Sequence, residues 1–245
     1  MLMQPPMCAQ LVLCVPGPWE DAQDFMRCIA AGTGGGYRVA AGLLTHAETG
    51  HVFEVQFEPR DERVRDAFDA AGRHWRGSPD MERIVDHRSV VYLLGHGGSD
   101  QNVHAFMLAA QALLDADGYG VKVESSGLAH PPDDWREMCA ALHLFSPFRA
   151  FVLVVTDPGE ASSCGMHTFG MYDVRVVDAD EASALLAAQK FSWYLYTERP
   201  AIRPGQTFSC DAHAPVYRIH ADAGIDYEYG SLFTNPFGTW RLERI

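Results

Sequence analysis

Short apolar stretches and longer stretches of helical spacing alternate along the chain, and they predict strands and helices in turn. In the first half, short runs bounded by Gly, Pro or Asp are typical of strands. These are Leu11–Val15, Tyr37–Leu44, Val52–Phe57 and Ser89–Leu94. Apolar residues three or four positions apart predict two helices. One can be capped by Asp21 or its neighbours and runs to about Ala31, and the other opens at Asp61.

The order of these elements is βαββαβ, which is the ferredoxin-like arrangement. A linking helix follows, from about Ser99 or Asn102 to Ala116. The same order of elements then begins again. The strands expected in the second half are Val121–Glu124, Ala150–Thr156, Asp173–Val177, Thr207–Cys210, Val216–His220 and Trp240–Leu242. The helices expected there are Asp133–Leu144 and Asp180–Thr197.

We therefore predict an α+β fold of two ferredoxin-like pseudo-repeats that pack together and are joined by the linking helix. The halves are residues 1–118 and 119–245. The polar stretch Asp157–Ser163 is a further place where we expect a boundary.

Composition and charge narrow the range of functions. Hydrophobic residues make up 47% of the 245 positions, which is enough for a substantial core. With 19 basic and 32 acidic residues, the net charge of −13 disfavours binding to DNA or RNA, whose phosphates attract Lys and Arg. The charge either maintains solubility or attracts a protein partner with a basic surface.

The lengths of the apolar runs and the contexts of the cysteines predict where the protein resides. No stretch approaches the roughly 20 apolar residues of a membrane helix, and no secretory signal is evident. Six cysteines are scattered along the chain, several in apolar contexts typical of buried free thiols. We expect a cytoplasmic protein without disulfides and without membrane contact.

The segment from Glu124 to His130 concentrates polar residues at the end of a predicted strand. Glu124, Ser126 and His130 offer a carboxylate, a hydroxyl and an imidazole for acid–base chemistry or metal binding. The alternative is structural: Glu124 and Ser126 satisfy backbone groups, and His130 packs on Trp135.

Two Cys-x-x-His pairs form a second set. Cys164 with His167, and Cys210 with His213, provide the two thiolates and two imidazoles of a tetrahedral zinc site. The alternative is that Cys164 is a small buried residue and His213 lies on a polar turn. We expect no cofactor other than this possible zinc ion.

The loop His96-Gly97-Gly98-Ser99 lies between a strand and a helix. It offers a helix N-terminus to a phosphate but lacks the lysine of a P-loop. A tight turn in which Ser99 or Asp100 caps the helix explains the same residues.

Several motifs in the second half resemble a known family. They are the run from Cys164 to Met171 followed by Asp173, the helix end Tyr194-Leu195, the turn Pro204-Gly205-Gln206-Thr207, and the tail from Asn235 to Leu242. The segment from Gly120 to His130 and Trp135 is similar to what precedes that domain in longer members. On these residues the chain resembles the bacterial domain of unknown function 4261. The resemblance implies an α+β fold without an assigned activity, and some relatives are associated with toxin–immunity or secretion loci.

Three functions follow as hypotheses. The first is a non-enzymatic protein-binding protein of the immunity or adaptor kind, suggested by the acidity and by the lack of a complete catalytic motif. The second is an enzyme or small-ligand binder with a site between the two halves. Its candidate residues are Glu124, Ser126, His130, Cys164, His167 and Asp173. The third is a structural zinc protein.

Overall fold

The chain forms two compact units, each built around one sheet. The computed structural model describes residues 9–141, 143, 145–224, 227–228 and 230–245. The seven-stranded unit consists of Gln10–His96 and Gln101–Ala150. The six-stranded unit contains Ala9, Gly97–Asp100 and Phe151–Ile245. The boundary that we predicted at residue 118 lies inside the seven-stranded unit.

The seven-stranded unit alternates strands with helices in its first part and adds a short hairpin and two helices later. Its strands are β1 (Gln10–Gly17), β2 (Tyr37–Ala40), β3 (Leu43–His46), β4 (Val52–Pro59), β5 (Ser89–His96), β6 (Val121–Val123) and β7 (Ala129–His130). Its helices are α1 (Ala22–Gly32), α2 (Arg63–Ala71), the single-turn η1 (Arg73–Trp75), α3 (Pro79–Val85), α4 (Asp100–Asp115), α5 (Pro132–Ala140) and α6 (Phe145–Phe151). The first residue of α4 and the last of α6 are assigned to the six-stranded unit. As predicted, Asp21 caps α1, because its side chain accepts a hydrogen bond from the backbone N–H of Asp24 at 2.7 Å.

The order of strands in this sheet is β2-β3-β4-β5-β1-β6-β7. Each neighbouring pair runs antiparallel. The ferredoxin-like topology is not confirmed, because helices α2 and α3 join the neighbouring strands β4 and β5, whereas that topology joins its adjacent consecutive strands by a hairpin. The strand that we expected to open a second repeat, β6, pairs instead with β1, with Leu13 opposite Val123.

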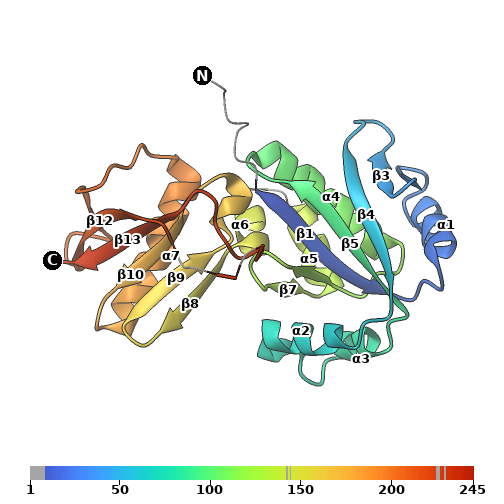
Figure 1. Cartoon of the computed structure of the whole chain (residues 1–245), viewed down its shortest axis with the longest axis horizontal. Coiled ribbons are helices and arrows are strands. Elements are labelled where there is room, and N and C mark those ends of the chain that lie inside the picture. The colour runs from blue at the N-terminus through green and yellow to red at the C-terminus, as the bar shows by residue number, and fades with distance from the viewer. Residues whose placement is uncertain (1–8, 142, 144, 225–226, 229) are drawn as a thin grey trace. The chain divides into compact units, whose positions relative to one another are not determined.

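Helices cover both faces of this sheet, because alternate residues of its central strands are apolar on both sides. On one face, α2, η1 and α3 bury Phe68, Trp75 and Ile84 against Cys14 and Val90 of β1 and β5. Phe106 of α4 packs on the other face, and a side chain at Gly95 would lie 2.8 Å from its ring. Figure 1 shows α2 and α3 below these strands, at one end of the sheet.

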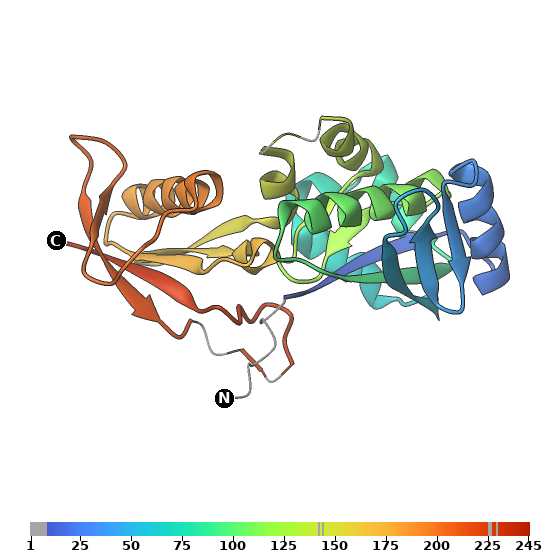
Figure 2. The same ribbon diagram turned by 90° about the horizontal axis from the view of Figure 1, so that it is seen from above.

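The six-stranded unit has a single long helix. Its strands are β8 (Leu153–Asp157), β9 (Glu160–Cys164), β10 (Asp173–Val177), β11 (Thr207–Ser209), β12 (Val216–Asp222) and β13 (Thr239–Arg244). A single-turn helix η2 (Met166–Phe169) precedes β10, and α7 (Glu181–Glu198) follows it. Figure 2 shows α7 lying along one face of the sheet.

The order of strands in this sheet is β11-β12-β13-β10-β9-β8. Among the strands that the structure describes, the β10–β13 pair alone is parallel, with Asp173 opposite Thr239, so the sheet is mixed. Our expectation of a boundary at Asp157–Ser163 is wrong, because Glu160–Cys164 forms β9 between β8 and β10.

The predicted α+β class is confirmed. Two sheets of seven and six strands are accompanied by seven α-helices in the part of the chain that the structure describes. Across the described ranges, no helix is long and apolar enough to cross a membrane.

One predicted strand is in fact a hairpin. Tyr37–Leu44 is divided into β2 and β3 by a two-residue turn, in which Ala41 has φ +50° and Gly42 has φ +76°. Two successive positive φ angles match a type I′ turn, whose twist suits paired strands. The sequence signal was weak because alanine rather than asparagine or glycine occupies the first position of the turn.

The turn therefore carries strain that a substitution can relieve. We expect Ala41→Asn to raise the free energy of unfolding by about 0.5–1 kcal/mol, because asparagine tolerates the left-handed region better than alanine. Urea unfolding measures the change. Ala40→Asn, placed in β2 just before the turn, is the control and should give no gain. An Ala41→Asn protein that is less stable than the wild type would contradict this account of the turn.

Candidate functional site

The six residues proposed from the sequence fall into two groups of three. Glu124, Ser126 and His130 belong to the β6–β7 hairpin of the seven-stranded unit. Cys164, His167 and Asp173 belong to the six-stranded unit, around the connection from β9 to β10.

Glu124 neutralises a buried lysine. The Nζ group of Lys122 donates a hydrogen bond to Glu124 Oε2 at 2.7 Å, and the lysine side chain is only 10% exposed. A buried ammonium without a partner would be strongly unfavourable, so the carboxylate has a structural task. The backbone N–H of Glu124 also donates to the carbonyl of Val12 at 3.0 Å, which holds the hairpin against β1.

His130 is held as a neutral imidazole in the interior. Its Nε2–H donates to the carbonyl of Ala150 at 3.0 Å, and its ring packs 5.5 Å from that of Trp135, as the structural alternative predicted. Burial lowers the pKa of His130 to about 4. Ser126 is also buried, and its hydroxyl has no hydrogen-bond partner among the described residues.

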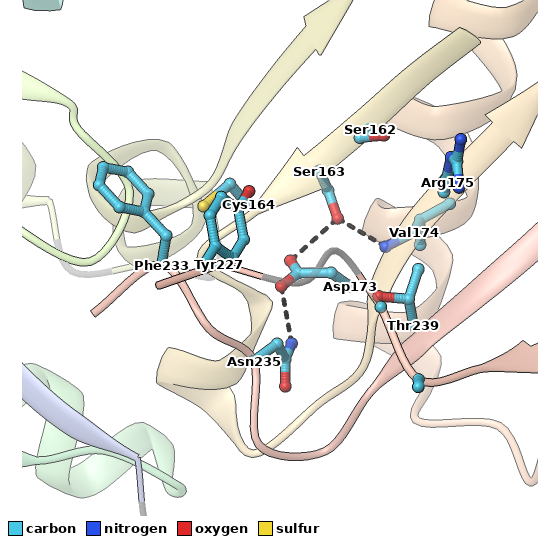
Figure 3. A pocket seen from close by; sticks show the side chains of 12 residues that line it. Ser162, Ser163, Cys164, Asp173, Val174, Arg175, Tyr227, Phe233, Asn235 and Thr239 are labelled. Atoms are coloured by element: carbon cyan, nitrogen blue, oxygen red, sulfur yellow. Dashed lines mark hydrogen bonds between the residues drawn. The ribbon is translucent and has the colours of Figure 1, made fainter. Parts of the chain in front are cut away.

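Asp173 is the centre of the second group (Figure 3). This carboxylate, 6% exposed, accepts hydrogen bonds from the hydroxyl of Ser163 at 3.1 Å and from the backbone N–H of Met166 at 3.2 Å. The side-chain amide of Asn235 donates to its other oxygen at 2.7 Å. These three donors replace the water that the buried carboxylate has lost.

The local fold explains why these donors converge. Asp173 is the first residue of β10, and its backbone N–H donates to the carbonyl of Gly238 at 3.1 Å, where β13 begins alongside it. Asn235 lies in the turn before β13, and its amide also donates to the carbonyl of Met171 at 2.9 Å. The sequence predicted a turn at Asn235, but not its contact with a residue 62 positions away.

Cys164 and His167 lie close to this carboxylate, but they do not form a catalytic dyad. Burial, followed by the negative charge of Asp173, raises the pKa of the Cys164 thiol to about 12, so it is protonated at neutral pH and a weak nucleophile. His167 is 1% exposed, and its Nδ1 lies 3.9 Å from Asp173 Oδ2, beyond hydrogen-bond distance. Neither ring nitrogen has a hydrogen-bond partner in the part of the chain described.

The cavity beside Asp173 is too small for an organic substrate. The described side chains around it include Cys164, Asp173, Tyr227, Phe233 and Asn235, and Figure 3 shows them around a common space. Its volume is about 20 Å³, whereas one water requires about 10–15 Å³ and ligand pockets usually exceed about 300 Å³. The cavity therefore suits a water molecule.

The zinc hypothesis is wrong for the four residues named. Within the described residues, no group of three or more His, Cys, Asp or Glu side chains is placed to hold a metal ion. The topology gives the reason. Cys164 ends β9, whereas Cys210 and His213 follow β11, four strands away in the sheet order. Four strand spacings of about 4.8 Å amount to roughly 19 Å, too far for ligands of one ion.

The glycine loop between β5 and α4 has its amides engaged within the protein. The N–H of Gly97 donates to the carbonyl of Ala9 at 3.1 Å, and that of Gly98 donates to the carbonyl of Thr168 at 2.8 Å. A phosphate cradle needs such groups to point at the ligand. The loop is therefore better explained as a structural turn.

Two larger hollows, which the sequence did not reveal, lie one on each unit. In the six-stranded unit, Tyr172, Leu195, Arg199, Ile202 and Trp240 are among the residues that line a hollow of about 500 Å³. In the seven-stranded unit, residues of β3, β4 and β5 line a hollow of about 430 Å³. Both combine residues that are distant in sequence, and no motif marks them.

Comparison with known proteins adds no relative. No protein-family model, no curated protein and no solved structure matches this chain. The resemblance of the second half to the domain of unknown function 4261 stays a prediction based on its motifs.

The neutral state of His130 predicts a pH-dependent stability. Its folded pKa of about 4 lies below the ordinary value of 6.5, so the unfolded chain binds a proton first as the pH falls. Stability should therefore be lost between about pH 6.5 and 4, by about 3 kcal/mol in total. His130→Gln keeps an amide donor for Ala150 and should lack this contribution, which urea unfolding at several pH values measures. Parallel stability curves for the two proteins would contradict the assignment.

Proposed function

We propose that this protein is a non-enzymatic protein-binding protein, of the immunity or adaptor kind, whose partner presents an apolar side chain next to basic residues. One observation carries the proposal: the hollow of the seven-stranded unit combines exposed aliphatic side chains with a glutamate. The cytoplasmic location and the relation to domain of unknown function 4261 belong to the same proposal.

The lining of the hollow follows from strand register. Leu43 of β3 lies opposite Glu54 of β4, and Glu54 lies opposite Leu94 of β5, so these three side chains form one row across the sheet. Val52 lies two residues before Glu54 and thus on the same face. Leu43 is 43% exposed and Val52 is 52% exposed. Together with Leu94 they form the aliphatic part of a lining that also contains Gln10, His51, His96 and Asn102.

The chemistry of this surface favours a basic protein as the partner. An apolar side chain can enter the hollow and be dehydrated there, while Glu54 attracts a neighbouring lysine or arginine. The net charge of −13 accelerates encounters with a basic surface, and added salt weakens that attraction.

An enzyme has less support. Among the candidate residues, Glu124 and Asp173 are engaged by internal donors, and the thiol of Cys164 is protonated. Neither ring nitrogen of His167 has a hydrogen-bond partner among the described residues, but the cavity beside Asp173 has a volume of only about 20 Å³. An acid–base reaction would require a pocket large enough for a substrate, and the candidate residues do not line one.

Random peptides displayed on phage provide a test that does not require the natural partner. We expect selection to enrich peptides in which an apolar residue lies next to Lys or Arg, with affinity that falls as salt increases. Leu43→Ser should weaken a selected peptide by about tenfold, because burial of a leucine contributes about 1.5–3 kcal/mol. Glu54→Lys should remove most of the dependence on salt.

The matched control is Leu186→Ser in α7. Leu186 is also 43% exposed, but it lies in the six-stranded unit, so peptide affinity should be unchanged. Selected peptides that bind the Leu43→Ser and Leu186→Ser proteins equally well would refute the proposed surface. Enrichment of acidic peptides would also refute it.

A further inference from the structure

Strand β8 is the outer strand of the six-stranded sheet. It pairs with β9 along all five of its residues, from Leu153 opposite Cys164 to Asp157 opposite Glu160. Among the described residues, no strand pairs with its other edge. An open edge of this kind is a template for another strand.

The backbone groups that β8 turns outward can be identified from the neighbouring strands. The carbonyl of Gly159 accepts the N–H of Asp178 at 3.1 Å, so β9 directs its odd-numbered residues toward β10. Its even-numbered residues therefore bond to β8. Glu160 lies opposite Asp157, Ser162 opposite Val155, and Cys164 opposite Leu153. The N–H and C=O groups of Val154 and Thr156 consequently point away from the sheet.

This edge lacks two features that often prevent pairing, proline or lysine on the strand and a bulge in its register. The sequence Leu-Val-Val-Thr-Asp contains no proline and no lysine, and its register with β9 is continuous, without a bulge. Val155 is 41% exposed, and Thr156 and Asp157 are also exposed. A short apolar strand in this state is available for pairing.

We infer that β8 pairs antiparallel with β8 of a second copy of this chain, around a twofold axis at Val155. In this register, Val154 of one copy lies opposite Thr156 of the other, and the outward groups of both form four backbone hydrogen bonds. The two Val155 side chains meet on one face. Asp157 lies opposite Leu153 of the second copy, so no like charges oppose each other across the pair.

A second copy suits this edge because, around this axis, the outward backbone groups of each copy meet hydrogen-bond partners and the two Val155 side chains lie opposite each other. The pairing is weak, since five residues per copy bury a small area and each copy carries a net charge of −13. Salt screens this repulsion, so dimerisation should strengthen as salt increases. The peptide binding proposed above should weaken under the same change, and the two proposals can therefore fail separately.

Sedimentation velocity of the full chain, from about 1 µM to about 1 mM, tests the association. We expect a reversible monomer–dimer equilibrium that shifts toward the dimer at high salt. Val155→Lys places two ammonium groups opposite each other and should give a monomer throughout, while its circular dichroism spectrum stays unchanged. A wild-type protein that stays monomeric at the highest concentration would overturn the inference, as would a dimer that persists in Val155→Lys.

Disulfide trapping tests the register independently. The paired Val155 residues form a non-hydrogen-bonded pair, with Cα atoms about 4.5 Å apart, within the range of a disulfide. Val155→Cys should therefore cross-link under mild oxidation much faster than wild type. Val154→Cys is the matched control, because its two copies are roughly 9 Å apart in this register, beyond disulfide reach. Equal cross-linking of the two variants would refute the twofold axis at Val155.

Discussion

The buried carboxylate of Asp173 is the interaction on which the six-stranded unit depends. Its donors come from three separate segments: Ser163 of β9, Met166 of η2 and Asn235 of the turn before β13. A buried charge is tolerated only when hydrogen bonds replace the water it has lost. These bonds hold the start of β10 next to the start of β13, with which it forms the one parallel pair among the described strands.

The same requirement explains three of the six polar residues that resembled a chemical site in the sequence, namely Glu124, His130 and Asp173. Lys122 and Glu124 satisfy each other, and His130 satisfies a backbone carbonyl. At the other end of β10, burial alone would raise the pKa of Asp178, but hydrogen bonds from the Asp180 N–H, Tyr217 and Arg244 outweigh it and lower that pKa. Under the proposed function, other proteins contact exposed apolar positions, whereas Glu124, His130 and Asp173 stabilise the fold.

The sequence predicted strands well where β-branched residues dominate, as in Asp173–Val177, which is β10 without change. It missed β9, whose residues Glu-Ala-Ser-Ser-Cys are small and polar, because pairing with strands on both sides rather than propensity makes this segment a strand. The candidate site shows the same limit. The segment Glu124–His130 was correctly identified as unusual, but the partners Lys122 and Ala150 that define its role became evident only in the fold.

The most direct test of this account is the stability of Asp173→Asn in urea. A structural carboxylate predicts a loss of about 3 kcal/mol, because the asparagine amide would face the donors that now bind the carboxylate. Asp133→Asn, whose side chain is 99% exposed, should change stability by less than about 0.5 kcal/mol. Residues kept for catalysis often reduce stability, so an Asp173→Asn protein as stable as wild type, or more stable, would contradict the structural role assigned to this carboxylate.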